Sequence, residues 1–204
     1  MGKVVTAATV SLDGYIAGPN EGGFDLLFAW FDGGDLELKT AIADIRIMLS
    51  EPDHRYLLEF FASVGAFVCG RRLFDLNGGW GGTHPLGLPV VVVTHHVPED
   101  WVAAHPDAPF TFVTDGLASA IEQARTLAGD RDVNVSSGKI SSQCLELGLL
   151  DEITIDLVPV LLGGGVPLYE PFEAPILLDG PTLVVQGQRV THLRYTVRRP
   201  RGDR

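Results

Sequence analysis

The stretch from residue 132 to residue 168 constrains the fold more than any other part of the sequence. It begins with the strand-like Val133–Val135, turns at Ser136-Ser137-Gly138, and continues with apolar residues at helical spacing until Gly148. A helix that follows a strand through such a tight polar turn leaves backbone N–H groups and the positive end of its dipole free. Open α/β sheets bind anions at such positions. The stretch therefore predicts a phosphate site at the start of a helix.

Composition favours a single compact domain. The chain has 204 residues, of which 46% are hydrophobic and 20% are charged, and no Pro/Ser-rich linker or block of charge divides it. We expect one domain over residues 1–198 and a basic tail over residues 199–204. The formal net charge of -11 argues against a nucleic-acid partner, because no basic face is available to replace the counterions of a phosphate backbone.

The two cysteines, Cys69 and Cys144, lie in separate apolar segments without a Cys-x-x-Cys partner. We therefore expect neither a metal site nor a disulfide. No charged-then-apolar leader opens the chain, and no apolar run approaches the roughly 18 residues that a membrane span needs. We expect a cytoplasmic protein that does not contact a membrane.

Strand-like and helix-like segments alternate along the chain, which predicts an α/β fold with a mostly parallel central sheet. Residues 182–186 and 189–198, joined at Gly187, look like a C-terminal antiparallel hairpin. Its alternating apolar residues, Leu193, Tyr195 and Val197, are expected to face the core. The expected strands before the hairpin are Val4–Val10, Ala66–Cys69, Pro89–Thr94, Phe110–Val113, Val133–Val135 and Glu152–Val158.

Apolar stripes at helical spacing predict four helices. Between the first two strands, residues 38–49 carry one stripe and residues 57–64 carry another, with Glu51-Pro52-Asp53 as the break between them. Two further helices are expected over residues 117–128 and 140–147, each followed by a glycine that can end it.

Several known nucleotide-binding and catalytic motifs are missing from the sequence. Residues 138–141 resemble the end of a P-loop, but Val133 stands where the first glycine of that loop belongs. Residues 163–165 are three glycines without the third position of the dinucleotide fingerprint. No G-x-S-x-G, H-E-x-x-H or zinc-deaminase motif occurs. The adjacent His95 and His96 point to opposite faces of an extended strand, so we expect no metal site there.

As an ordered set, five segments resemble the dihydrofolate reductase superfamily, and most closely the branch with the C-terminal reductase domain of bifunctional riboflavin-biosynthesis enzymes. The set covers about residues 3 to 197. The resemblance implies a single-domain dihydrofolate reductase-like three-layer fold, NADPH across the strand ends, a small-molecule substrate and a homodimer. The segments are 7–18 (AATVSLDGYIAG), 70–75 (GRRLFD), 91–95 (VVVTH), 148–152 (GLLDE) and 158–163 (VPVLLG).

The resemblance implies that Arg71 meets the phosphates of the cofactor and that Thr94 and His95 meet its adenosine 2′-phosphate. An arginine fork and a hydroxyl that follow strands also suit a phosphate dianion on chemical grounds. The alternative is that Arg71 and Arg72 only begin a solvated helix. The whole expected cofactor set is Ala8, Ile16, Gly70, Arg71, Arg72, Thr94, His95, Val135, Ser136, Ser137, Gly138, Lys139, Ile140 and Ser141.

The resemblance also implies a catalytic Asp13, which lies beside the nicotinamide and holds the substrate or relays a proton. The backbone at Ala8 and Ile16 then clasps the carboxamide. Asp-Gly is a common turn, and the alternative is that Asp13 only bonds its own backbone. Trp30 and Phe31 are expected to wall the substrate pocket, unless they belong to the core.

Two positions depart from the family pattern. Ser136 and Ser137 stand where the family usually has Gly-Gly, and glycine allows a closer approach of phosphate to the backbone. Leu73 stands where the family often has a hydroxyl residue. Cofactor binding at the serine pair is therefore an open question.

The expected function is the NADPH-dependent reduction of a small heterocycle, similar to that of 5-amino-6-(5-phosphoribosylamino)uracil reductase. One alternative is a pterin or dihydrofolate-type reductase, for whose helical acid the sequence offers only Asp32 and Asp35 as candidates. The other is a non-catalytic nucleotide-binding module.

Overall fold

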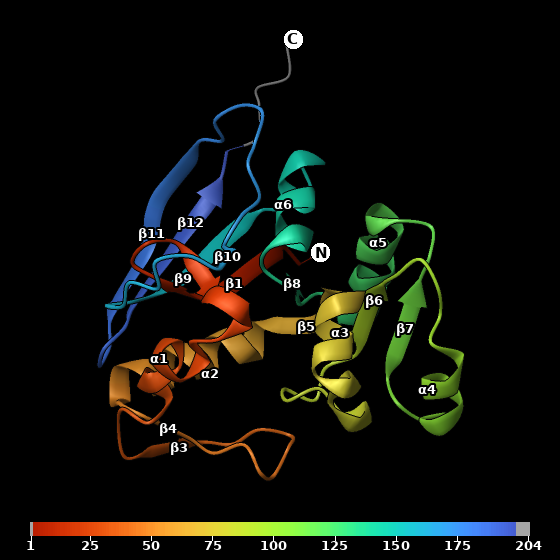
Figure 1. The fold of residues 1–204 in the computed structure, drawn as a ribbon, viewed down its shortest axis with the longest axis horizontal. Coiled ribbons are helices and arrows are strands. Elements are labelled where there is room, and N and C mark those ends of the chain that lie inside the picture. The colour runs from red at the N-terminus through yellow and green to blue at the C-terminus, as the bar shows by residue number, and fades with distance from the viewer. Residues whose placement is uncertain (1, 199–204) are drawn as a thin grey trace.

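The computed structural model describes residues 2–198, which fold around an eight-stranded sheet (Figure 1). The predicted basic tail, residues 199–204, lies outside the described residues. The strands of this sheet are β1 Val4–Ser11, β5 Val64–Gly70, β6 Val90–Val93, β7 Phe110–Val113, β8 Asp132–Val135, β9 Glu152–Val158, β11 Leu178–Gln186 and β12 Thr191–Val197.

The order of the strands across the sheet is β11-β12-β9-β1-β8-β5-β6-β7. The six strands from β9 to β7 run parallel to one another, and β12 pairs antiparallel with β9 on one side and with β11 on the other. The predicted α/β fold, with its mostly parallel sheet and its C-terminal antiparallel hairpin, is confirmed.

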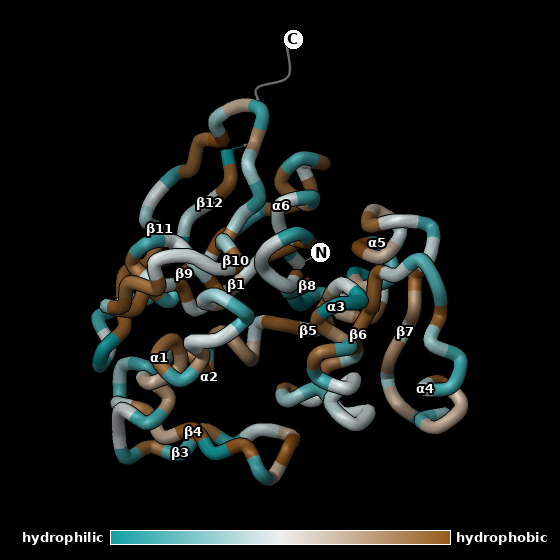
Figure 2. The backbone as a smooth tube through the Cα atoms, viewed as in Figure 1, coloured by the Kyte–Doolittle hydropathy of each residue, from teal (hydrophilic) through white to brown (hydrophobic). Residues whose placement is uncertain are grey.

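The central strand β5 shows why the sheet needs cover on both sides. Ala66 and Val68 pack into the core on one face, whereas Phe67 and Cys69 pack into the core on the other. A continuous apolar run of this kind is typical of strands between two layers of helices. Figure 2 shows β5 and β6 in brown, the hydrophobic end of its scale.

Helices cover both faces, which gives the predicted three layers. Helices α5 (Leu117–Ala128) and α6 (Lys139–Glu146) pack on one face, and α2 (Glu51–Ser63) and α3 (Arg71–Leu76) pack on the other. Within the described part of the chain, no helix is long and apolar enough to cross a membrane. The remaining elements are α1 Phe24–Leu27, α4 Glu99–Ala104, the 3-10 turns η1 Pro19–Glu21, η2 Ala29–Phe31 and η3 Gly78–Gly82, and the short strand pair β2 Tyr15–Ala17 and β10 Val166–Pro167.

The predicted helix over residues 38–49 is wrong. The chain there forms two short antiparallel strands, β3 (Leu36–Leu38) and β4 (Ile47–Leu49). Between them the hydroxyl of Thr40 donates to the carbonyl of Ile42 and accepts from the amide of the same residue. Local bonds of this kind compete with the backbone bonds of a helix, so the apolar stripe is paired as strands instead.

The predicted helix over residues 57–64 is confirmed, but α2 begins earlier. The tripeptide Glu51-Pro52-Asp53 forms its first turn, because proline lacks only a backbone N–H that the first turn leaves unbonded in any case. The tripeptide therefore starts a helix instead of separating two helices. This early start brings Asp53 into the interior, where its side chain is fully buried.

The last strand, β12, buries its predicted face only in part, with Val197 packed against the core. Leu193, Tyr195 and Val197 are each only half-buried. The fully buried side chain of the strand is His192, which points to the opposite face because neighbouring residues alternate. The pattern of apolar residues predicted the strand correctly, but it did not indicate that His192 is the fully buried residue of this strand.

Candidate functional site

The carboxyl ends of the parallel strands open into a cavity of about 1820 Å³. Ala8 of β1, Gly70 of β5, Thr94 after β6 and Ser136 after β8 all line it. Parallel strands place their carboxyl ends at one edge of the sheet, which is where open α/β sheets bind ligands. The topology thus brings these four residues, all predicted to bind the cofactor, to one cavity.

The start of α6 presents backbone N–H groups to this cavity. Ser137, Lys139 and Ile140 line it, and within the described residues no hydrogen bond to their amide nitrogens is found. The amide of Ser136 is already used, since it donates to the carbonyl of Val68 at 2.8 Å. Free N–H groups at a helix start are the feature that binds phosphate oxygens, and they fit the phosphates of a dinucleotide.

The serine pair is not strained. Of this turn only Gly138 has a positive φ, at 78°, and this backbone region is one that glycine adopts without cost. Ser136 and Ser137 have no positive φ, so replacing Gly-Gly leaves the turn intact. Their effect on a ligand is limited to the space and the hydroxyl groups that they add.

Two residues of the predicted phosphate segment lie behind the cavity wall. Val135 and Ser141 are fully buried and are not among the residues that line the cavity. The hydroxyl of Ser141 donates to the carbonyl of Gly138 at 3.0 Å and so stabilises the turn. Direct contact with a molecule in the cavity is open to the lining residues of this segment, which are Ser136, Ser137, Gly138, Lys139 and Ile140.

The predicted basic positions also line the cavity. Arg71 donates from Nε to Asp75 at 2.7 Å and from Nη1 to the carbonyl of His96 at 3.0 Å, and Arg72 is paired with Glu21. Arg71, Arg72, Thr94 and His95 all border the cavity. These ion pairs are solvent-exposed, so they are weak enough for a phosphate to replace them.

Asp13 stands outside the lining of the cavity and ties two loops together. Its carboxylate accepts from the hydroxyl of Ser11 at 2.6 Å and from the amides of Leu162 at 3.1 Å and Gly163 at 2.7 Å. These hydrogen bonds, that of Ser11 first, hold the pKa of Asp13 below its usual range. Ala8 and Ile16, predicted to act with Asp13, do line the cavity.

Trp30 and Phe31 lie between the cavity and the core. They line the cavity and pack in the core, with ring centroids 4.5 Å apart. Trp30 is only 1% exposed, and its Nε1 has no hydrogen-bond partner within the described residues. A buried indole N–H usually has a partner, so this one is an exception inside the wall of the cavity.

A cluster of four buried polar residues, absent from the sequence prediction, lies behind this wall. We call Asp53, Tyr56, Asp156 and His192 the carboxylate–histidine cluster. Asp156 and Tyr56 also line the cavity. The signal in the sequence was an aspartate among the apolar residues of Glu152–Val158, since a lone carboxylate on a buried strand requires partners.

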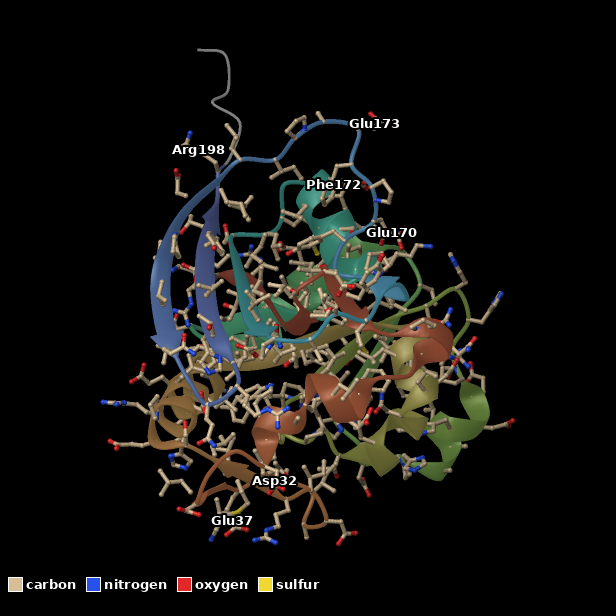
Figure 3. All side chains as sticks on the ribbon, turned by 60° about the vertical axis from the view of Figure 1, so that its left-hand side comes forward. Asp32, Glu37, Glu170, Phe172, Glu173 and Arg198 are labelled. Carbon is tan, nitrogen blue, oxygen red and sulfur yellow. The ribbon has the colours of Figure 1, made fainter. Side chains whose placement is uncertain are left out.

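The two carboxylates considered for a pterin-type acid do not reach the cavity. Asp32 and Asp35 are exposed and are not among its lining residues. Figure 3 shows Asp32 near Glu37, at the end of the molecule where β3 lies and away from Glu170 and Phe172. Within the described residues, no group of three or more His, Cys, Asp or Glu side chains is arranged to bind a metal ion.

Comparison with known proteins gives structural matches only. No protein-family model and no curated protein matches the sequence. A protein assigned to riboflavin biosynthesis from Shewanella sp. PV-4 is 23% identical, with a TM-score of 0.67 over 98% of this chain and 100% of its own. A pyrimidine reductase-like protein from Corynebacterium diphtheriae is 11% identical, with a TM-score of 0.56 over 98% of this chain and 93% of its own.

RibD of Acinetobacter baumannii is 16% identical, with a TM-score of 0.62 over 97% of this chain and 58% of its own. The chain thus spans little more than half the length of that protein. All three sequence identities are too low to assign an activity to this chain, and the matches show a shared fold alone. The chain has the dihydrofolate reductase-like fold that its sequence predicts, and it shares this fold with these riboflavin-biosynthesis and pyrimidine reductase-like proteins.

Proposed function

We propose that this chain is an NADPH-dependent reductase of a small heterocyclic substrate, similar in activity to a 5-amino-6-(5-phosphoribosylamino)uracil reductase. The observation that carries the proposal is the row of free N–H groups at Ser137, Lys139 and Ile140, which borders the same cavity as Arg71 and Arg72. Backbone N–H groups and arginine forks are the donors that phosphates prefer. One cavity therefore offers several phosphate-binding groups.

In this proposal the α6 turn holds the pyrophosphate of NADPH, and Arg71, Thr94 and His95 hold the 2′-phosphate. NADPH supplies a hydride to a polarised C=N bond or to the opened ribose of an aminouracil-like substrate. The protein binds and orients both molecules and excludes water. Trp30 and Phe31 give the cavity an aromatic wall against which a planar ring can stack.

The cofactor assignment is tested by calorimetry with NADPH and NADH. NADPH should bind more tightly, and Arg71→Ala should weaken it by about 1.5–3 kcal/mol through loss of charged hydrogen bonds, with little effect on NADH. Arg198→Ala is the matched control, because Arg198 is also paired with an aspartate, Asp179, on the distant hairpin. Equal affinities for NADPH and NADH, or no binding of either, would contradict the cofactor assignment.

The catalytic role of Asp13 is also a proposal. Asp13→Asn should keep NADPH binding and reduce turnover by roughly 10²–10⁴-fold, the range typical of acid/base groups. Ser11→Ala is the control, since it removes one hydrogen bond to the carboxylate and keeps its charge. If turnover survives in Asp13→Asn, the residue serves only to join the loop after β1 to residues 162–163.

A non-catalytic nucleotide-binding module is the competing function. NADPH oxidation measured with a panel of aminouracils and pteridines separates the two, because a module binds NADPH without oxidising it. The same panel distinguishes an aminouracil reductase from a pterin reductase. The homodimer implied by the resemblance remains a prediction, which sedimentation of the purified chain can check.

A further inference from the structure

The carboxylate–histidine cluster is built around the imidazole of His192. Its Nδ1 lies 2.7 Å from Oδ1 of Asp156, and its Nε2 lies 2.9 Å from Oδ1 of Asp53. Tyr56 donates its hydroxyl to the same Oδ1 of Asp156 at 2.9 Å and stacks on the imidazole with ring centroids 3.8 Å apart. Three elements, α2, β9 and β12, therefore meet at one histidine.

The arrangement favours the protonated form of His192. Each ring nitrogen faces a carboxylate oxygen, and only the doubly protonated ring donates to both. Burial alone would lower the pKa of His192, but the hydrogen bonds and charges of Asp156 and Asp53 outweigh burial and raise it. Burial and the charge of Asp156 also raise the pKa of Tyr56, so its hydroxyl remains a donor.

The two carboxylates differ in how fully they are used. Asp53 accepts from His192 on one oxygen and from the hydroxyl of Ser50 and the amide of Gln188 on the other. Asp156 accepts both of its bonds on Oδ1, and no bond to its Oδ2 is found within the described residues. Within the described residues, the carboxylate oxygen of the cluster without a partner therefore belongs to Asp156.

Asp156 faces the cavity. Side chains along β9 alternate, and Asp156 sits opposite Thr9 of β1, which also lines the cavity. The side chain of Asp156 is 10% exposed. The surrounding wall is mostly apolar and includes Trp30, whose indole N–H has no partner, and Phe31. A carboxylate in such a wall favours ligands that donate hydrogen bonds to it.

We propose that Asp156 determines substrate specificity by accepting hydrogen bonds from adjacent N–H groups on the edge of a planar, cationic or amidine-like substrate ring. His192 is a positioning residue, which fixes the orientation of the Asp156 carboxylate and is itself held by Asp53. The role of this contact in substrate binding rests on the proposed reductase function. It adds the class of substrate, a flat ring with paired N–H donors, which the phosphate-binding groups do not specify.

Benzamidine, a flat cation with two N–H donors, is the probe. It should bind the wild-type protein in calorimetry, and acetophenone, of similar shape but without donors, should bind at least about tenfold more weakly. Asp156→Asn should weaken benzamidine by at least about tenfold. Asp179→Asn is the matched control, because Asp179 is an exposed aspartate on the distant β11, and it should leave benzamidine binding unchanged.

If Asp156→Asn does not fold cooperatively, Thr9→Leu takes its place. The longer side chain fills the space beside Asp156 and leaves the cluster intact, so it should also weaken benzamidine. The proposal is overturned if benzamidine has the same affinity for the wild type and for either variant. It is also overturned if acetophenone binds the wild type as tightly as benzamidine does.

A titration with NADPH separates this proposal from the proposed function. Benzamidine binding that depends on Asp156 in a protein that does not bind NADPH supports the carboxylate site and contradicts the cofactor. Normal NADPH binding with benzamidine affinity that Asp156→Asn does not change supports the cofactor and overturns the carboxylate site.

Discussion

Two buried histidines near the same cavity have pKa values that are shifted in opposite directions. His192 lies between two carboxylates, which raise its pKa. His84 packs against the rings of Phe67 and Trp80, at centroid distances of 4.8 and 5.3 Å, and burial lowers its pKa to about 4. Both side chains are less than 9% exposed. Burial sets the shift at His84, whereas at His192 the two neighbouring carboxylates outweigh burial.

The surroundings of His84 and His192 also differ in the kind of contact that holds each ring. Around His84 the contacts are aromatic, and within the described part of the chain its side chain has a single hydrogen bond, a long one of 3.3 Å from the amide of Leu86 to Nδ1. Around His192 each polar contact is between a charged group and its partner. Aromatic packing tolerates the loss of a neutral ring better than a charged cluster tolerates the loss of its only cation.

The largest expected effect comes from removing that cation. His192→Leu leaves Asp53 and Asp156 as buried carboxylates without a counter-charge, which should lower the free energy of unfolding by about 3–5 kcal/mol in urea titrations at neutral pH. His84→Leu replaces a neutral ring in an apolar site and should cost about 1.5 kcal/mol or less. Equal losses in the two variants would remove the distinction between the two regions.

A smaller effect is expected from acid acting on His84. Its folded pKa of about 4 lies below the unfolded value of 6.5, so the unfolded chain binds the proton first and stability falls as pH drops from 6.5 to about 4. The loss should reach roughly 3 kcal/mol, at about 1.4 kcal/mol for each pH unit. His84→Phe should lose less stability than the wild type over this window. Parallel curves for the two proteins would contradict a buried neutral His84.

The smallest effect is expected from base acting on His192, because burial opposes the two carboxylates. Its folded pKa is raised above 6.5, so its contribution to stability is complete below that pH and is lost as the pH rises through the folded pKa. The His192 ring should stay doubly protonated in NMR titrations to higher pH than an exposed histidine. A ring that deprotonates below pH 6.5 would show that the carboxylates do not hold the proton.

Much of the fold followed from residue patterns alone. The apolar run of β5 and the turn before α6 have a local cause, and so has the stop at Gly129, whose φ is 64°. The residues expected to bind the cofactor came from the family resemblance, and most of them line one cavity because parallel strands end at one edge of the sheet. The helix over residues 38–49 failed because Thr40 turns the chain, which an apolar stripe does not reveal.

The sequence by itself determined the order along the chain of the strands in the parallel sheet, the helices over residues 117–128 and 140–147 and the turn before α6, because each depends on neighbours along the chain. Only the tertiary structure decided the charges of the histidines and the grouping of Asp53, Asp156 and His192. These residues are far apart in the sequence, and the charge of a buried group depends on which distant partners surround it. The tertiary structure likewise tied Asp13 to Gly163, since a contact between remote loops leaves no periodic signal in either segment.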